Sequence, residues 1–299
     1  MKKQQIDTEE IVKQVLSNVT ESFDELKQNF DWQLGIDEAG RGPVIGPMLY
    51  AACYWPTKYH KLISETCKFV DSKQINEATR DRLFDVLTQL KGKVLTFETR
   101  ELTAEYLSKN QLAHLTINLN DISHNTAADL IQNAIIKGYK ITEIYVDTVG
   151  PKQTYRNFLQ GKLQELGKVA NIVVEEKADS KYANVSAASI CAKVTRDYKI
   201  TQIQQEILPN DSIGSGYPGD PKTKKYLENT NIRFFVFPKY IRFSWQTIKT
   251  IINDRDLNID YKDEQEASKQ VQNLKTYFPL QNQAKIYNYK SVTFSNCIL

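Results

Sequence analysis

Gly35-Ile36-Asp37-Glu38-Ala39-Gly40-Arg41-Gly42 is the stretch on which the interpretation of this chain depends. Two adjacent carboxylates end an apolar run, a Gly-Arg-Gly turn follows, and a second apolar run extends from Val44 to Trp55. This order predicts a strand, a sharp turn and a strand, with Asp37 and Glu38 at the rim of a sheet. Adjacent carboxylates repel each other, so they favour a bound cation between them. Oxygen ligands of this kind select Mg²⁺ or Mn²⁺.

The glycines of this stretch do not form a dinucleotide-binding pattern. In G-x-G-x-x-G a third glycine would come one residue before Gly46, and a helix rather than a strand would follow. The chain also lacks a P-loop, which argues against a nucleotide-binding α/β protein. A turn whose amides come close to a sugar is the better interpretation, because Gly40 and Gly42 have no Cβ in the way.

Composition indicates a globular protein: 41% of the 299 residues are hydrophobic and 25% are charged. The longest apolar runs fall well short of the roughly 18–20 residues of a membrane span. The first ten residues have no apolar secretory core and include acids, so we expect the chain in the cytosol or nucleus. The four cysteines form no CxxC pair and the three histidines have no metal-ligand spacing, which argues against disulfides and zinc.

Basic residues gather in one region of the sequence. Residues 177–250 hold 12 Lys or Arg and 6 Asp or Glu, although the net charge of the whole chain is only +3. A regional surplus suits a groove for a polyanion. Ordinary surface charge explains the same numbers, and both interpretations stay open.

Strand and helix patterns alternate along the middle of the chain, which predicts an α/β fold with a mixed sheet. We expect strands at about 33–38, 44–55, 93–99, 142–149 and 170–175, and helices at about 8–28, 76–90, 120–138, 153–166 and 182–207. Residues 1–30 are then an amphipathic helical extension and 31–253 the catalytic domain, with a helical C-terminal part. Residues 254–299 are a tail that we expect to bind partners.

Four carboxylates stand out by their context: Asp37, Glu38, Asp147 and Asp179. Asp147 ends a predicted strand, and Asp179 lies between a strand and a long helix. Strand ends of α/β sheets converge on one rim, where four acids could hold two divalent ions about 4 Å apart for in-line phosphoryl displacement. A single acid at a strand end is more often a helix N-cap or a solvated loop residue, and for Asp147 alone that alternative is favoured.

Seven segments in order resemble the catalytic subunits of eukaryotic type 2 ribonucleases H. They are GIDEAGRGPVIGPM (35–48), DSKQINEATR (71–80), INLNDISHNTA (117–127), YVDTVGP (145–151), KADSKYANVSAASICAKVTRD (177–197), GSGYPGDPKT (214–223) and FPKYIRFSW (237–245). The resemblance covers about residues 33–250.

The resemblance implies an RNase-H-like fold with a central five-stranded sheet. It also implies Mg²⁺-dependent cleavage of RNA in RNA/DNA hybrids, with Mn²⁺ also supporting activity. It further implies incision on the 5′ side of single ribonucleotides in duplex DNA, leaving 3′-OH and 5′-phosphate ends, for ribonucleotide excision repair and RNA primer removal. The family's metal-binding acids fall on Asp37, Glu38, Asp147 and Asp179, and none is replaced. A nuclear enzyme with two non-catalytic partner subunits, B and C, is expected.

The resemblance also implies a set of substrate contacts. Backbone groups of Gly40, Arg41 and Gly42 are expected to sense the 2′-OH, which distinguishes RNA from DNA. Tyr217 is expected to meet the 2′-OH and stack on the next sugar, although a buried core tyrosine is the alternative. The remaining expected contacts are Ser72, Lys73, Lys193 and Arg196 with phosphates, and Asn120, which could equally be a helix N-cap.

Two further hypotheses concern function outside the acid site. Residues 271–278 (VQNLKTYF) resemble a sliding-clamp docking peptide, with Val271 in place of the usual glutamine, and an ordinary amphipathic segment is the alternative. A nucleic-acid-binding scaffold without turnover is the competing function for the whole chain. Four intact acids argue against that scaffold.

Overall fold

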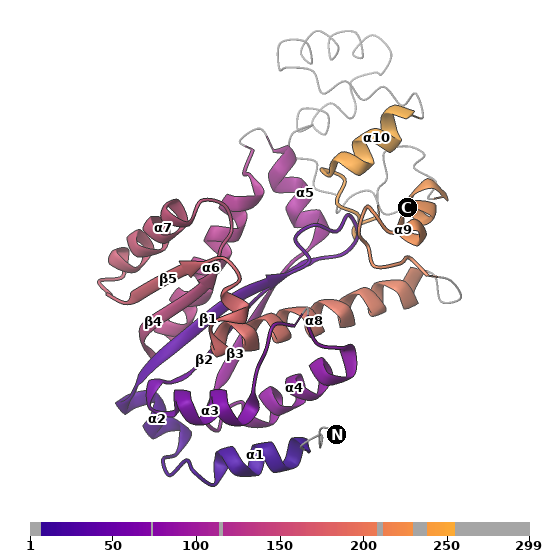
Figure 1. The fold of residues 1–299 in the computed structure, drawn as a ribbon. Helices are drawn as coiled ribbons and strands as arrows, with labels where there is room; N and C mark the ends of the chain where they lie inside the picture. The colour runs from indigo at the N-terminus through magenta and orange to yellow at the C-terminus, as the bar shows by residue number, and fades with distance from the viewer. Residues whose placement is uncertain (1–6, 73, 114–115, 208–211, 230–237, 255–299) are drawn as a thin grey trace, which may run out of the picture.

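The computed structural model describes residues 7–72, 74–113, 116–207, 212–229 and 238–254. Lys73, Cys297 and the predicted docking peptide 271–278 therefore lie outside the described residues. A mixed five-stranded sheet with the order β3-β2-β1-β4-β5 forms the centre (Figure 1). Its strands are β1 (Asp31–Ala39), β2 (Met48–Pro56), β3 (Thr96–Leu102), β4 (Lys140–Asp147) and β5 (Asn171–Glu175). β1 is antiparallel to β2 and parallel to β4, which gives the mixed sheet that was predicted.

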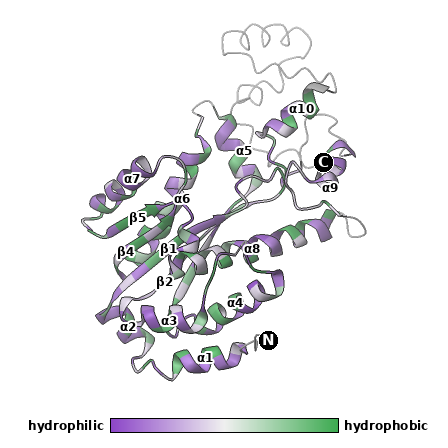
Figure 2. Cartoon of the chain, in the orientation of Figure 1, coloured by the Kyte–Doolittle hydropathy of each residue, from purple (hydrophilic) through white to green (hydrophobic). Residues whose placement is uncertain are grey.

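Helices cover both faces of the sheet. The helices are α1 (Thr8–Leu16), α2 (Phe23–Asn29), α3 (His60–Cys67), α4 (Glu77–Leu90), α5 (Ala104–Leu112), α6 (Leu119–Ile136), α7 (Lys152–Glu165), α8 (Ala183–Ile207), α9 (Pro221–Asn229) and α10 (Gln246–Asp254), with 3₁₀ turns η1 (Thr57–Tyr59) and η2 (Ala178–Ser180). α8 packs on β1 and β2 with α4 beside it, whereas α6 and α7 contact the sheet and each other on the other face. Many helices in Figure 2 mix hydrophilic and hydrophobic residues, as expected for helices that cover a sheet. Within the described ranges, every helix is too short or too polar to span a lipid bilayer.

The N-terminal segment differs from the single helix predicted for residues 8–28. It forms two helices, because Ser22 starts α2 with a capping box: its hydroxyl accepts from the Glu25 amide, and the Glu25 carboxylate accepts from the Ser22 amide. Ile11, Val12 and Val15 of α1 are buried in the main hydrophobic core, where α1 contacts α3 and α4.

The predicted strand 44–55 was wrong at its start, since β2 begins at Met48. Val44 and Ile45 leave the sheet and join a second apolar cluster formed with α9, α10 and neighbouring segments. The Ile45–Ile241 bridge and the hydrogen bond from the Arg242 amide to the Val44 carbonyl (2.8 Å) fix this segment to residues near the C-terminal end of the described chain. The turn at residues 40–42 therefore lies between two cores.

α8 lies unusually close to β1 at Gly35. A Cβ on Gly35 would lie 2.3 Å from the backbone carbon of Asn184, the second residue of α8. Side chains alternate along a strand, so Asp37 faces α8 as Gly35 does, while Glu38 faces α6 and α7. The contact at Gly35 thus sets the depth at which Asp37 is buried.

We predict that Gly35→Ala destabilises the protein by about 1–3 kcal/mol, because the added methyl group meets backbone atoms that move only with α8. Urea unfolding measures this change in the free energy of unfolding. Gly161→Ala in α7 is the matched control: a Cβ there has no atom within 4 Å, so the change is expected to be neutral or stabilising by up to about 1 kcal/mol. Equal stability of the two variants would contradict the close approach of α8.

Candidate active site

Asp37 and Asp147 end neighbouring parallel strands. β1 and β4 are paired in register through Ile36 and Val146, so the next residues, Asp37 and Asp147, lie side by side at the carboxyl edge of the sheet. Asp147 is in turn paired with Glu175 of β5. The predicted convergence of these two acids on one rim is therefore seen in the strand register.

The Asp37 carboxyl group is buried with one oxygen unsatisfied. Its side chain belongs to a residue only 3% exposed; Oδ1 accepts a hydrogen bond from the Glu38 amide (2.7 Å), and Oδ2 has no hydrogen-bond partner among the described residues. Burial raises the pKa of Asp37 well above its ordinary value, and the carboxylates of Glu38 and Asp147 raise it further. Contacts with the Ser189 hydroxyl and the Glu38 amide act on the pKa in the opposite direction. An unsatisfied buried carboxylate oxygen beside two other acids fits a divalent cation.

Asp179 is joined to this edge through η2. It is 2% exposed, and its neighbour Ala178 donates an amide hydrogen bond to Asp147 Oδ1 (2.9 Å). Asp147 thus also caps a turn, as the alternative interpretation of a lone strand-end acid proposed, while remaining next to Asp37. Ser186 of α8 donates to the Asp179 carbonyl oxygen (2.5 Å) and fixes the turn to the helix.

The four acids are neighbours without forming a closed ligand cage. Among the described residues, no group of three or more His, Cys, Asp or Glu side chains is arranged to hold a metal ion. The alternation along β1 explains this, because Asp37 and Glu38 start from opposite faces of the sheet.

The Gly-Arg-Gly turn is held from behind by two residues from the C-terminal part of the catalytic region. Arg242 donates from Nη2 to the Gly40 carbonyl oxygen (2.6 Å), from Nη1 to that of Arg41 (2.9 Å) and from Nε to that of Gly46 (2.9 Å). Trp245 Nε1 donates to the Gly42 carbonyl oxygen (3.2 Å). Within the described part of the chain, the amides of Arg41 and Gly42 donate no hydrogen bond. The carbonyls are thus occupied, and the turn offers donors rather than the expected donor and acceptor set.

Arg242 was not identified from the sequence as a residue of this site. It is fully buried, and its guanidinium lies 4.8 Å from the centre of the Trp245 ring. Burial, with a smaller effect from nearby Arg196, lowers the pKa of Arg242 to about 9. It keeps its charge at neutral pH, where that charge strengthens the hydrogen bonds to the turn. A single arginine in the segment FPKYIRFSW carries no local sign of this long-range contact.

Tyr217 and Arg196 lie on the other side of the turn. Tyr217 is 44% exposed, so the alternative of a buried core tyrosine is wrong. Its ring is 3.5 Å from the position of a Cβ on Gly42, and the Arg196 guanidinium is 5.7 Å from the ring centre. Arg196 is only 3% exposed, and a Cβ on Gly40 would lie 2.2 Å from its Nε. Arg196 therefore supports the turn and the tyrosine from below, rather than standing free at the surface.

The other predicted substrate contacts differ in accessibility. Ser72 is buried and shares a 2.9 Å hydrogen bond with Ser189, the residue beside Asp37. Lys193 is partly exposed and pairs with Asp197 one turn along α8 (2.6 Å). Asn120 is not the N-cap of α6, because the Asn118 side chain has that role. Instead Asn120 Oδ1 accepts from Arg41 Nη2 (2.5 Å), which joins the Gly-Arg-Gly turn to α6.

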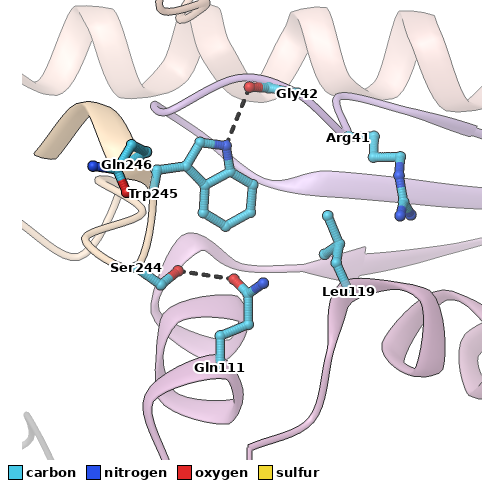
Figure 3. A pocket seen from close by; sticks show the side chains of 7 residues that line it. All are labelled: Arg41, Gly42, Gln111, Leu119, Ser244, Trp245 and Gln246. Carbon is cyan, nitrogen blue, oxygen red and sulfur yellow. Dashed lines mark hydrogen bonds between the residues drawn. The ribbon is translucent and has the colours of Figure 1, made fainter. Parts of the chain in front are cut away.

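An open pocket adjoins the turn on the side of α5 (Figure 3). It is lined by Arg41, Gly42, Gln111, Leu119, Ser244, Trp245 and Gln246. Ser244 Oγ donates to Gln111 Oε1 (2.8 Å), and the Trp245 indole extends between α5 and the turn. The pocket thus continues the surface of the turn away from the acids.

Comparison with known proteins agrees with this arrangement. The model of the ribonuclease HII family matches residues 34–248. The catalytic-type ribonuclease H2 chain of Dictyostelium discoideum, its A-subunit, is 40% identical over 290 residues (94% of this chain, 96% of the relative), and the same chain of Homo sapiens is 42% identical over 235 residues (77% and 76%). The solved ribonuclease H2 of Pyrococcus horikoshii OT3 superposes with a TM-score of 0.63 at 30% identity, covering 76% of this chain and all of that one.

The fold and the acids at its edge define a nuclease of the RNase-H-like class, and the chain belongs to the ribonuclease HII family of endoribonucleases. Within that family it is similar to the A-subunits of the eukaryotic ribonucleases H2 along most of its length. Divalent metal ions are the cofactors of this family, and the Bst RNase HIII solved in complex with Mn²⁺ shares the fold (TM-score 0.59, 16% identity, 79% of this chain and 73% of that one).

We predict that Asp37→Asn stabilises the metal-free protein at pH 7. Because the folded pKa of Asp37 is raised, the folded state binds its proton more tightly than the unfolded chain does. Ionisation therefore lowers the stability of the wild type as pH rises above the unfolded value of about 4. Thermal unfolding in EDTA from pH 4 to 8 should show an advantage for the variant that grows with pH. Asp129→Asn, at an exposed position of α6, is the control without such an advantage. A variant less stable than the wild type at pH 7 would show that the Asp37 charge is compensated within the chain.

Proposed function

We propose that this chain is a Mg²⁺-dependent endoribonuclease that cleaves the RNA strand of RNA/DNA hybrids and incises duplex DNA on the 5′ side of single ribonucleotides. The products are 3′-OH and 5′-phosphate ends. The observation that carries the proposal is the buried Asp37 carboxylate, with one oxygen unpaired within the described chain, next to Asp147 and Glu38 and close to a turn that offers free amides.

Asp37, Glu38, Asp147 and Asp179 would hold the metal ions. Bound divalent cations polarise the attacking water and stabilise the leaving 3′-oxyanion of a phosphodiester. Mg²⁺ and Mn²⁺ both suit a site made of carboxylate oxygens. The protein's own part is to bury and fix the acids, which it does through α8, η2 and the hydrogen bond to Asp147.

Selection of a ribonucleotide follows from the turn and Tyr217. A 2′-OH can accept hydrogen bonds, and the amides of Arg41 and Gly42 are donors without partners within the described chain. Gly40 keeps the turn free of a Cβ where Arg196 packs against it. The exposed ring of Tyr217, supported by Arg196, would stack on the sugar that follows the ribonucleotide.

Phosphate contacts would position the duplex without reading its sequence. Lys193 is the accessible cation of α8 among the predicted contacts, and Lys73 stays a prediction because it lies outside the described residues. Ser72 is buried, so it would act by holding Ser189 next to Asp37. Asn120 would act by fixing the Arg41 side chain.

Asp147→Asn tests the proposed function. We expect cleavage to fall by a factor of at least about 10³, because the substitution removes one of the metal-binding charges on which phosphoryl transfer depends, while binding of the hybrid stays within about threefold. Cleavage of duplexes with one, four or no ribonucleotides, with and without Mg²⁺, is measured beside gel-shift binding.

Asp85→Asn, at an exposed position of α4, is the control and should cleave like the wild type. A wild-type chain that binds hybrids but cleaves none of these duplexes, alone or with its partner subunits, would favour the non-cleaving scaffold. An Asp147→Asn variant that cleaves at the normal rate would exclude the site itself.

Partner binding is proposed for the C-terminal tail, residues 254–299. Its apolar residues are Phe278, Leu280, Ile286, Tyr287, Tyr289, Val292, Phe294 and Ile298, an unusual composition for a free tail. We infer that they bind the two non-catalytic subunits of a ribonuclease H2 complex. The sliding-clamp hypothesis for residues 271–278 also stays a prediction; the ribonuclease HII of Archaeoglobus fulgidus has been solved in complex with PCNA (27% identity, TM-score 0.59, 72% of this chain and 95% of that one).

We predict that deleting residues 260–299 abolishes co-purification with the two partner subunits, because the deletion removes the apolar residues of the tail. Pull-down from cells that co-express the three chains measures the interaction. The thermal unfolding temperature of the shortened chain should stay close to that of the full chain. A complex that survives the deletion would place the interface elsewhere.

A further inference from the structure

Two tyrosines on the α6 and α7 face of the sheet are buried with unsatisfied hydroxyl groups. Tyr50 is 1% exposed and Tyr155 is fully buried, and neither hydroxyl has a hydrogen-bond partner among the described residues. Leaving a buried hydroxyl unpaired costs free energy, and phenylalanine would fill the same space without that cost. Unpaired buried polar groups in folded proteins are uncommon, so the two hydroxyls need an explanation.

Both tyrosines lie next to Glu38. Tyr50 of β2 is the direct antiparallel partner of Glu38 on β1, so the two side chains leave the sheet on the same face as close neighbours. Tyr155 lies in the first turn of α7, shortly after Asp147. Its ring stacks on His124 of α6, with ring centres 3.9 Å apart and planes at 10°. His124 Nε2 is hydrogen-bonded to the Val149 carbonyl oxygen (2.8 Å), which fixes the stacked pair.

The charges around the two phenols agree with this placement. Burial raises the pKa of Tyr50 and of Tyr155, and the Glu38 carboxylate is the next largest cause for each. The acids of the neighbouring strand ends raise the pKa of Tyr155 as well. Arg41 lowers the pKa of both phenols, and the Ser123 hydroxyl lowers that of Tyr50, without reversing the effect of burial. Both hydroxyls therefore keep their protons and are donors at neutral pH.

We propose that Tyr50 and Tyr155 are positioning residues that donate hydrogen bonds to the Glu38 carboxylate when the enzyme holds its metal ions. The inference rests on the proposed function. Glu38 starts from the face of the sheet opposite to Asp37, so its carboxylate needs to be directed to the shared edge. Two rigid donors on that face would fix its direction, as partners of metal-binding carboxylates commonly do. Their unpaired state in the metal-free chain is the cost of that arrangement.

Tyr50→Phe and Tyr155→Phe, made in the full chain, test the proposal. In EDTA the thermal unfolding temperature of each variant should equal or exceed that of the wild type, because an unpaired buried hydroxyl is removed. Mn²⁺ affinity, measured by calorimetry, should fall about tenfold in each, the effect of one hydrogen bond to a charged group. The Mg²⁺ concentration needed for half-maximal cleavage should rise in parallel.

Tyr54→Phe is the matched control. Tyr54 is as buried as Tyr50, but its hydroxyl donates to Glu98 Oε1 (2.6 Å). Its loss should lower the unfolding temperature by about 2–4 °C and leave Mn²⁺ affinity unchanged. A drop of this kind in EDTA for Tyr50→Phe or Tyr155→Phe would show that their hydroxyls serve the fold alone, and would overturn the proposal.

A double-mutant cycle with Glu38→Gln separates the two levels of the argument. If the tyrosines act through Glu38, their substitution should change Mn²⁺ affinity by less than about twofold in the Gln variant. A tenfold loss that persists there, or unchanged Mn²⁺ affinity of the Phe variants with Glu38 intact, would overturn this inference alone. Glu38→Gln that cleaves hybrids at the wild-type rate would instead overturn the proposed function.

Discussion

Successive residues of a strand point to opposite faces of a sheet, and this constraint governs the whole site. Asp37 is directed under α8 and Glu38 toward α6 and α7, so the acids of one sequence pair reach a common edge from two sides. The site therefore needs both helical layers in place. α8 fixes the depth of Asp37 through its approach to Gly35, and the other layer surrounds Glu38 with buried aromatic residues.

Charge burial is handled differently on the two sides of the Gly-Arg-Gly turn. At the acids, negative charge is concentrated with few compensating donors, which raises the pKa of Asp37 and leaves one of its oxygens unsatisfied within the described chain. Behind the turn, the buried cation of Arg242 is satisfied by three backbone carbonyls instead of a carboxylate. The turn connects an electronegative edge to an electropositive support, which is the polarity that a metal-bound phosphodiester and its sugar require.

Much of this arrangement was predictable because it is written in local patterns. The order of strands and helices and the position of acids at strand ends follow from periodicity and from the turn at residues 40–42. What failed depends on contacts between distant segments: Val44 and Ile45 look like strand residues but pack in the second core, and Arg242 looks like any basic residue. The choice between Asn118 and Asn120 as the cap of α6 depended on Arg41, which holds Asn120 away from that role.

The attachment of Arg242 to the turn has a consequence for how the nuclease is made. Residues 40 and 242 meet across a sequence separation of 202, so the turn gains its support only after most of the polypeptide has been synthesised. A nascent chain that has emerged as far as α8 already contains all four acids but not the arginine that holds the turn. Sugar discrimination is thus acquired last on the ribosome, after the parts that could break a phosphodiester.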